Sequence, residues 1–203
     1  NAEHAVQLIR PPAFYPDHNI DLLTEQRVTR VDRAAQTVHT ATKAISYDRL
    51  VLCTGSSHIT PPIEGIDHPR CFQLRTAADA TAIRYQAATS SRCVVIGAGF
   101  IGLEVAASLR IQGLDVTVLE LTPRVLARVT SPEISTYFEA LHRERGVAIH
   151  TDVGVTAVRE KLHGLAVVTA SGTAFEGDLV VLGVGAKADS GLAEAAGLEV
   201  NNG

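Results

Sequence analysis

The stretch Cys93-Val-Val-Ile-Gly97-Ala-Gly99-Phe-Ile-Gly102-Leu-Glu104 decides the fold of this 203-residue chain. An apolar run precedes three spaced glycines, and this order predicts a buried strand, a tight turn and a helix. Gly97 permits the turn, Gly99 lets backbone N–H groups approach a ligand, and Gly102 lets the helix lie close to the sheet. The start of such a helix offers free N–H groups and the positive end of the helix dipole. The stretch therefore predicts a diphosphate cradle.

A second predicted strand, Val116-Thr-Val-Leu-Glu120, ends on a carboxylate. Glu120 lies 23 residues after Gly97, close to the spacing of about 20 residues at which an acidic side chain meets the ribose of a bound dinucleotide. A carboxylate accepts a hydrogen bond from a ribose 2′-hydroxyl. The two segments together predict a βαβ unit that binds a dinucleotide. Glycines that serve only a tight turn are the alternative.

The composition excludes several classes of partner. The net charge is −4 and no basic run occurs, which argues against nucleic acid and anionic membranes. No segment reaches the roughly 20 apolar residues of a membrane span. The eight histidines lack metal-ligand spacing, so we expect no metal site, and we expect His142 to be solvated. The cysteines number three, an odd count that favours a reducing, cytoplasmic setting over a disulfide framework, and they form no CxxC pair. We expect Cys53 and Cys93, inside apolar runs, to be buried thiols.

The order of the remaining elements predicts an α/β domain. Short strands are expected within 20–53, the last of them an apolar run that ends at Thr54-Gly55, and a linker rich in proline follows. Helices are expected over 77–89, 101–111, 132–145 and 190–196. Beyond the βαβ unit, strands are expected over 147–150, 153–159, 166–169, 173–176 and 178–183. This order predicts a three-layer, Rossmann-like domain with a β-meander over 76–188.

Several segments together resemble one family. They are Arg10-Pro-Pro-Ala-Phe-Tyr15, Tyr47-Asp-Arg-Leu-Val-Leu-Cys-Thr54-Gly55, Leu74-Arg75-Thr76, the glycine stretch, Glu139-Ala-Leu-His-Arg-Glu-Arg-Gly-Val147 and Gly183-Val-Gly-Ala186. In this order they resemble the FAD-dependent pyridine nucleotide-disulfide oxidoreductases, and within them the ferredoxin and rubredoxin reductases. At position 53 this chain has a cysteine, Cys53, where the family's Ala-Thr-Gly motif has an alanine.

The resemblance implies a flavoprotein oxidoreductase that works in electron transfer. Hydride passes from NADH to FAD, and electrons then pass to a ferredoxin or rubredoxin. Residues 1–75 would be a partial FAD-binding domain with an incomplete FAD site, 76–188 the NAD(H)-binding domain, and 189–203 a return segment to the FAD domain. We therefore interpret the chain as a piece of a longer enzyme and expect the piece alone to be inactive.

The resemblance also assigns site residues. The NAD contacts it implies are Gly97, Gly99, Phe100, Ile101, Gly102, Glu104, Glu120, Arg128, Val184 and Gly185, and the FAD contacts are Val28, Thr54, Gly55 and Arg75. It implies that Glu104 positions the nicotinamide, whereas the residues alone favour a carboxylate stabilised by the helix N-terminus. It also suggests that Arg128 reaches the adenosine side.

Charge predicts a preference between NADH and NADPH. Glu120 should favour NADH, because a carboxylate repels a 2′-phosphate, although Arg124 and Arg128 could offset that repulsion. Two other functions stay open. One is an NADH oxidase or the flavin module of a nitrite reductase, and the other is an NAD-binding domain without turnover.

Overall fold

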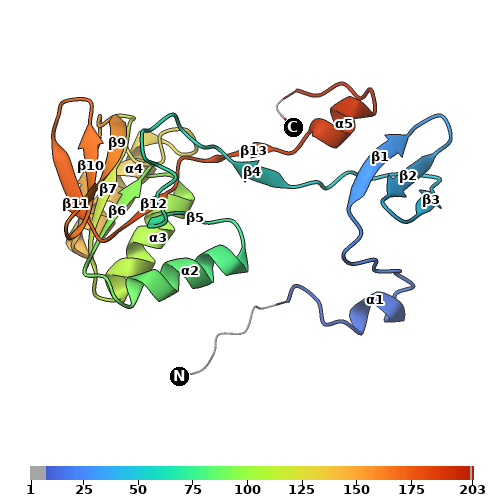
Figure 1. Cartoon of the computed structure of the whole chain (residues 1–203), viewed down its shortest axis with the longest axis horizontal. Helices are drawn as coiled ribbons and strands as arrows, with labels where there is room; N and C mark the ends of the chain where they lie inside the picture. Colours follow the sequence, from blue (N-terminus) through green and yellow to red (C-terminus); the bar gives the residue numbers. More distant parts are fainter. Residues whose placement is uncertain (1–7, 202) are drawn as a thin grey trace. The chain divides into compact units, whose positions relative to one another are not determined.

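The computed structural model describes residues 8–201 and 203, and the chain divides into two compact units (Figure 1). One unit comprises 58–186, and the other comprises the described residues up to Ser57 together with Lys187–Gly203. The predicted boundary was residue 76. Residues 58–75, which lie before that boundary, are part of the larger unit and contribute its edge strand.

The larger unit is built on a five-stranded parallel sheet. Its strands, in spatial order, are β5 (Cys71–Gln73), β12 (Leu179–Leu182), β6 (Arg92–Ile96), β7 (Asp115–Leu119) and β8 (Val147–His150). The helices are α2 (Ala77–Ala87), α3 (Phe100–Ile111) and α4 (Pro132–Glu144). An antiparallel meander contains β9 (Val155–Lys161), β10 (Gly164–Thr169) and β11 (Ala174–Gly177).

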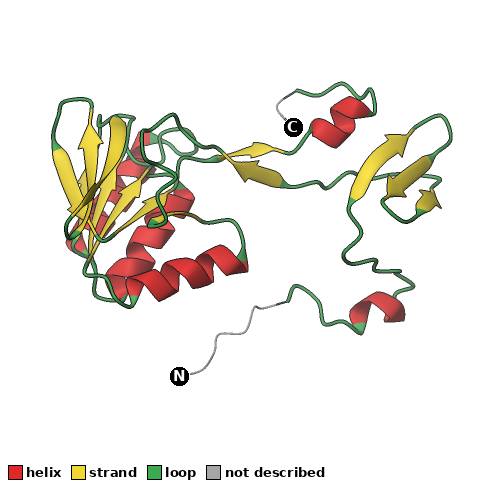
Figure 2. Ribbon diagram, viewed as in Figure 1, coloured by secondary structure: helices red, strands yellow, loops and turns green. Residues whose placement is uncertain are grey.

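Helices and the antiparallel meander cover the parallel sheet (Figure 2), and the two faces of the sheet bury two separate cores. In β6, Cys93 and Val95 belong to the core shared with the helices, whereas Val94 and Ile96 belong to the core shared with the meander. Alternate residues of a strand point to opposite faces, so a strand covered on both sides is apolar throughout. The predicted three-layer α/β fold with a meander is therefore confirmed.

Local signals in the sequence set the ends of the helices. Thr76 begins α2 with a capping box: its hydroxyl accepts from the Asp79 amide at 3.2 Å, and the Asp79 carboxylate accepts from the Thr76 amide at 2.7 Å. Pro132 occupies the first turn of α4, as predicted, but Ser131 before it makes no side-chain cap. Gly146 follows α4 with a φ of +84°, the left-handed conformation expected of a helix-ending glycine.

Three glycines fix α3 against the sheet. A Cβ on Gly102 would overlap the carbonyl oxygen of Gly97, and a Cβ on Gly97 would lie 2.6 Å from the carbonyl oxygen of Gly183. A Cβ on Gly183 would in turn lie 2.8 Å from the Cα of Gly102. The backbone of the turn, the first turn of α3 and the end of β12 therefore meet without side chains between them. This contact explains the predicted role of Gly102.

Asp178 joins the start of β12 to the start of β6. One of its carboxylate oxygens accepts from the amides of Ser91 and Arg92, at 2.7 and 2.9 Å. Burial by itself would raise the pKa of Asp178, but these hydrogen bonds and the Arg92 guanidinium outweigh it and hold the pKa below its ordinary value. The ionised carboxylate is thus part of the folded structure.

The smaller unit is a sheet of three short strands with two short helices. Its elements are α1 (Phe14–Asp17), β1 (Val28–Asp32), β2 (Thr37–Thr40), β3 (Ala44–Ser46) and α5 (Gly191–Ala195). The guanidinium of Arg33 donates to the carbonyl oxygen of Gly197 at 2.9 Å, which ties the segment after α5 to the turn after β1. Two further strands, β4 (Ser56–His58) and β13 (Ala186–Ala188), pair with each other.

Two predicted strands were wrong. Neither 20–23 nor 50–53 forms a strand, and Val51 is 80% exposed. Cys53, predicted to be a buried thiol, is exposed. The physical reason is that an apolar run becomes a strand only when other strands pair with its backbone, and none does so within the described part of this chain.

Replacing Asp178 with alanine should lower the free energy of unfolding by about 1–2 kcal/mol at pH 7, because two backbone donors lose an ionised acceptor. A group whose pKa is depressed by folding stabilises above its unfolded pKa of about 3.9, and that contribution is lost as the pH falls through the folded value. The difference from wild type should therefore shrink below about pH 4. Urea unfolding at several pH values measures this difference.

The control Asp115→Ala removes an aspartate that is 85% exposed and should change the free energy of unfolding little. If the free energy of unfolding of Asp178→Ala were as far below that of wild type at pH 2.5 as at pH 7, the ionised carboxylate would not be what stabilises the fold.

Replacing Gly102 with alanine should destabilise the larger unit by about 1–3 kcal/mol, because the added methyl group must push α3 away from the turn at Gly97. Thermal unfolding provides the measurement. Gly191→Ala is the control, since a Cβ on Gly191 would meet nothing within 4 Å. Equal melting temperatures for Gly102→Ala and wild type would show that the contact does not constrain the helix.

Candidate nucleotide-binding site

The glycine turn leads into α3 at the carboxyl ends of β6 and β12, where open α/β sheets bind ligands. Gly99 is the N-cap of α3, with φ −74° and ψ −178°, and it has no side chain to cap the helix. The first N–H groups of an α-helix have no partner within the helix. A Cβ on Gly99 would meet only the carbonyl oxygen of Gly183, at 3.8 Å. Apart from its chain neighbours, no side chain therefore packs within 4 Å of the point where a Cβ on Gly99 would lie.

Glu120 is held at this turn by three donors. The amide of Ala98, between the first two glycines, donates to Oε2 at 2.6 Å. The amide and hydroxyl of Thr122 donate to Oε1 at 2.8 and 2.7 Å. A carboxylate offers about four acceptor positions, so one remains for a ligand hydroxyl. The side chain is half-buried and fixed in orientation before any ligand arrives.

The loop after Glu120 was missed as a part of the site. The amide of Leu126 donates to the carbonyl oxygen of Ala98 at 2.9 Å, so both backbone groups of Ala98 are bound. Arg124 donates within this loop, to the carbonyl oxygens of Ala127 at 2.8 Å and Thr130 at 3.0 Å. With a further hydrogen bond to the Ser135 hydroxyl in α4, its guanidinium is committed to protein groups of its own loop and of the helix that follows. Only the closeness of Arg124 to Glu120 in sequence hinted at a role.

Arg128 lies beside two other residues predicted to bind NAD. Its Nη2 is 3.4 Å from the carbonyl oxygen of Val184, a weak hydrogen bond. The same atom lies 3.4 Å from where a Cβ on Gly185 would be, and Gly185 has a φ of +108°. The structure thus brings together Arg128, Val184 and Gly185 beyond the end of β12. Gly183, the residue before them, packs on Gly102.

The start of α3 exposes three predicted residues. Phe100 is 52% exposed and Ile101 is 43% exposed, which is unusual for such apolar side chains in one helical turn. Glu104 is exposed on the next turn, and its carboxylate pairs with no other described residue. All three are accessible to a ligand that occupies the helix N-terminus.

The residues predicted to contact FAD divide between the units. In the smaller unit, Val28 begins β1, the Thr54 hydroxyl donates to the carbonyl oxygen of Asp189 at 2.6 Å, and the amide of Asp189 donates to the carbonyl of Gly55 at 3.0 Å. Thr54 and Gly55 are thus held together by the returning chain. Arg75 lies in the larger unit, where its amide donates to Asp79 at 2.9 Å.

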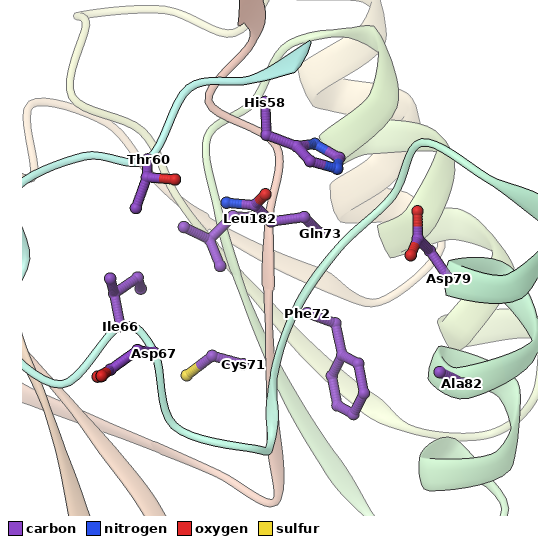
Figure 3. Close-up of a pocket in the computed structure, with 10 residues that line it drawn as sticks. All are labelled: His58, Thr60, Ile66, Asp67, Cys71, Phe72, Gln73, Asp79, Ala82 and Leu182. Carbon is purple, nitrogen blue, oxygen red and sulfur yellow. The ribbon is translucent and has the colours of Figure 1, made fainter. Parts of the chain in front are cut away.

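A hollow of about 440 Å³ lies beside the edge strand β5 (Figure 3). Figure 3 shows the His58 imidazole directed toward Asp79, and the thiol of Cys71 on the other side near Asp67. Burial, together with the charge of Asp67, raises the pKa of Cys71 to about 11, so this thiol is protonated at neutral pH. None of the residues predicted to bind NAD or FAD lines the hollow, although Leu182 in its wall precedes Gly183.

The larger unit contains one misjudged histidine. His142, expected to be solvated, is only 9% exposed. Its Nδ1 lies 2.8 Å from the carbonyl oxygen of Phe138 and its Nε2 lies 3.2 Å from that of Leu103. His142 therefore joins α4 to the first turns of α3. Its spacing from Phe138, one helical turn earlier, was the signal that it faces inward.

Neither a metal cluster nor a membrane helix is found in the described residues. No three histidine, cysteine, aspartate or glutamate side chains gather there as ligands for an ion. No helix in this part of the chain has the length and apolar character needed to cross a bilayer.

Comparison with known proteins places this geometry in a family. Rhodocoxin reductase from Rhodococcus erythropolis is 42% identical over 96% of this chain and 46% of its own length. Putidaredoxin reductase from Pseudomonas putida is 41% identical over 96% of this chain and 48% of its own length. The chain thus spans about half the length of these curated relatives.

Solved structures agree with the sequence relatives. The ferredoxin reductase for the CYP199A2 system from Rhodopseudomonas palustris matches with a TM-score of 0.91 and 38% identity, over 98% of this chain and 49% of its own. An NADPH-bound, engineered variant of the water-forming oxidase from Lactobacillus brevis matches with a TM-score of 0.80 and 28% identity, over 92% of this chain and 42% of its own.

The family pattern itself extends over residues 2–203. It covers both units, the glycine turn and the carboxylate at the end of β7. The chain belongs to the pyridine nucleotide-disulphide oxidoreductase family.

Proposed function

We propose that the chain is the NADH-binding portion of a flavoprotein reductase that transfers hydride from NADH to FAD and electrons onward to a ferredoxin or rubredoxin. The observation that carries the proposal is Glu120, held by Ala98 and Thr122 at the glycine turn. The names of the relatives support the acceptor class, because they include reductases for putidaredoxin, rhodocoxin and rubredoxin.

In this proposal the residues of the larger unit bind and orient the dinucleotide. The N–H groups at the start of α3 hold the diphosphate over Gly99, and Glu120 accepts from the adenosine ribose. Phe100, Ile101 and Glu104 then face the nicotinamide half. Val184 and Gly185, with Arg128 beside them, border the same space. No acid, base or nucleophile is needed, since a hydride transfer depends on orientation and on the exclusion of water.

FAD would be held in part by Val28, Thr54, Gly55 and Arg75. The pairing of Thr54 and Gly55 with Asp189 fits this role, because it presents a turn of fixed backbone, with Gly55 at a φ of +79°. When bound, the flavin supplies the step from a two-electron donor to one-electron acceptors. We place the protein in the cytoplasm, where its free cysteines would stay reduced.

Selection of NADH over NADPH follows from charge. A 2′-phosphate would face the ionised Glu120, and Arg124, the nearest cation in sequence, donates into its own loop instead. The engineered NADPH-bound relative supports this assignment. Its substitutions include a glycine and an aspartate eighteen positions apart, the separation between Gly102 and Glu120 in this chain.

Replacing Glu120 with glutamine should reduce the preference for NADH over NADPH by about tenfold, since it removes the repulsive charge but keeps an oxygen for Thr122. Fluorescence titration of the 203-residue chain with each nucleotide measures the two affinities. Glu139→Gln, which changes a half-buried carboxylate of α4 paired with Arg143, is the control and should leave the preference unchanged. If Glu120→Gln keeps the wild-type preference, Glu120 does not meet the ribose.

The protein expressed from its complete gene should reduce a ferredoxin or rubredoxin with NADH when loaded with FAD, and reduce it far more slowly with NADPH. Stopped-flow absorbance of the flavin and of the iron–sulfur acceptor follows both steps. Turnover with oxygen or nitrite alone would instead identify an oxidase or a nitrite reductase module. Nucleotide binding without flavin reduction would leave only a binding domain.

A further inference from the structure

The loop between β7 and α4, residues 121–131, folds around the side chain of Arg124. One terminal nitrogen, Nη1, donates to the carbonyl oxygen of Thr130 at 3.0 Å and to the hydroxyl of Ser135. The other, Nη2, donates to the carbonyl oxygen of Ala127 at 2.8 Å. Ser135 is only 1% exposed, and its hydroxyl donates to the carbonyl oxygen of Val125 at 2.6 Å. One guanidinium thus holds two carbonyl groups of the loop and one hydroxyl in the first turn of α4.

Within this loop, Leu126 has an unfavourable backbone conformation. Its φ is +54°, in the left-handed region that a bulky side chain rarely adopts. Its side chain is 3% exposed, so burial holds the residue in place. Its carbonyl oxygen accepts from the amides of Val129 and Thr130, at 3.0 and 3.1 Å. Such a conformation persists only where the surrounding contacts determine it, and residues held in this way often lie at functional sites.

The unusual conformation has a definite consequence for the glycine turn. It directs the amide of Leu126 to the carbonyl oxygen of Ala98, at 2.9 Å, while the amide of Ala98 is bound by Glu120. Thr122 links the two, because its hydroxyl oxygen lies 2.7 Å from the Glu120 carboxylate and 3.0 Å from the carbonyl oxygen of Arg124, and its single proton is shared between these two acceptors. A continuous set of hydrogen bonds therefore runs from the turn to Arg124.

We propose that Arg124 is a positioning residue for the nucleotide site: by holding the 121–131 loop, it fixes the Leu126 amide on Ala98 and so sets the shape of the glycine turn before NADH binds. The inference deepens the proposed function and rests on it. Arg124 acts through the loop rather than on the cofactor, because three of its hydrogen bonds point to protein groups.

The geometry of the guanidinium distinguishes positioning from simple charge. A planar fork can donate to several fixed acceptors at once, whereas a lysine ammonium is a point charge on a flexible stem. If Arg124 positions the loop, lysine cannot replace it. If its positive charge merely attracts the anionic cofactor, lysine should replace it well.

Arg143→Leu is the matched control, since Arg143 lies on the surface of α4 and pairs only with Glu139 among the described residues.

The first measurement uses no nucleotide. Amide hydrogen exchange of the 203-residue chain should show the Leu126 amide protected in wild type and in Arg143→Leu, and at least about tenfold less protected in Arg124→Leu and Arg124→Lys. The amides of Val94 and Val95 in β6 report whether the unit stays folded. Should Arg124→Leu unfold, the milder Arg124→Lys decides the result. Unchanged protection of Leu126 in a folded Arg124→Lys variant would overturn the inference.

The second measurement adds ADP-ribose, which carries the diphosphate and the adenosine ribose without the nicotinamide. Its affinity should fall about tenfold in Arg124→Lys, the loss of roughly one charge-assisted hydrogen bond, and stay at the wild-type value in Arg143→Leu. Wild-type affinity in Arg124→Lys would overturn the inference alone. Failure of the wild-type chain to bind either ADP-ribose or NADH would instead overturn the proposed function, and with it the nucleotide role of Arg124.

Discussion

The close approach of three backbone segments at Gly97, Gly102 and Gly183 is the constraint on which the site depends. A side chain on any of the three would collide with the backbone of another. The contact sets the first turn of α3 directly at the ends of β6 and β12. Because the helix begins there, its unpaired N–H groups and positive dipole point into the space above Gly99. The proposed anion site is therefore a consequence of backbone packing, and side chains refine it.

Hydrogen bonds to the backbone of Ala98 fix the shape of the glycine turn. Ala98, the residue between two glycines, is bound through its amide by Glu120 and through its carbonyl by Leu126. Glu120 thus has two tasks in this account, since it shapes the turn and also offers an acceptor to the ribose. A site whose ligand groups are fixed in advance loses less entropy when the ligand binds. The strained Leu126 is the structural cost of that order.

The sequence predicted the layers and the glycine turn because both rest on local, periodic signals. The apolar run before Gly97 could only suit a strand covered on both faces, and Thr76 and Pro132 marked helix starts by their own chemistry. The contact of Gly183 with Gly102 joins segments about 80 residues apart, so no local pattern announced it. The same limit applies to Arg124, whose charge suggested a ligand, while its partners are two carbonyl groups of its own loop and the Ser135 hydroxyl in α4.

The errors have a common physical origin. The run before Thr54 has the composition of a buried strand, yet composition reports only how a segment would pack if partners were present, and Val51 is left 80% exposed. The edge strand β5 shows the converse case. Its three residues carry little strand signal, and they become a strand because β12 pairs with them. Pairing between distant segments decides both outcomes.

Backbone amide chemical shifts of the isotopically labelled chain, recorded during addition of NADH, would follow the proposed binding over the glycine turn of the larger unit. The largest changes should occur at Gly99, Phe100 and Ile101, with a further change at Thr122. Changes confined to the hollow beside β5, at residues such as Cys71 and Gln73, would contradict it.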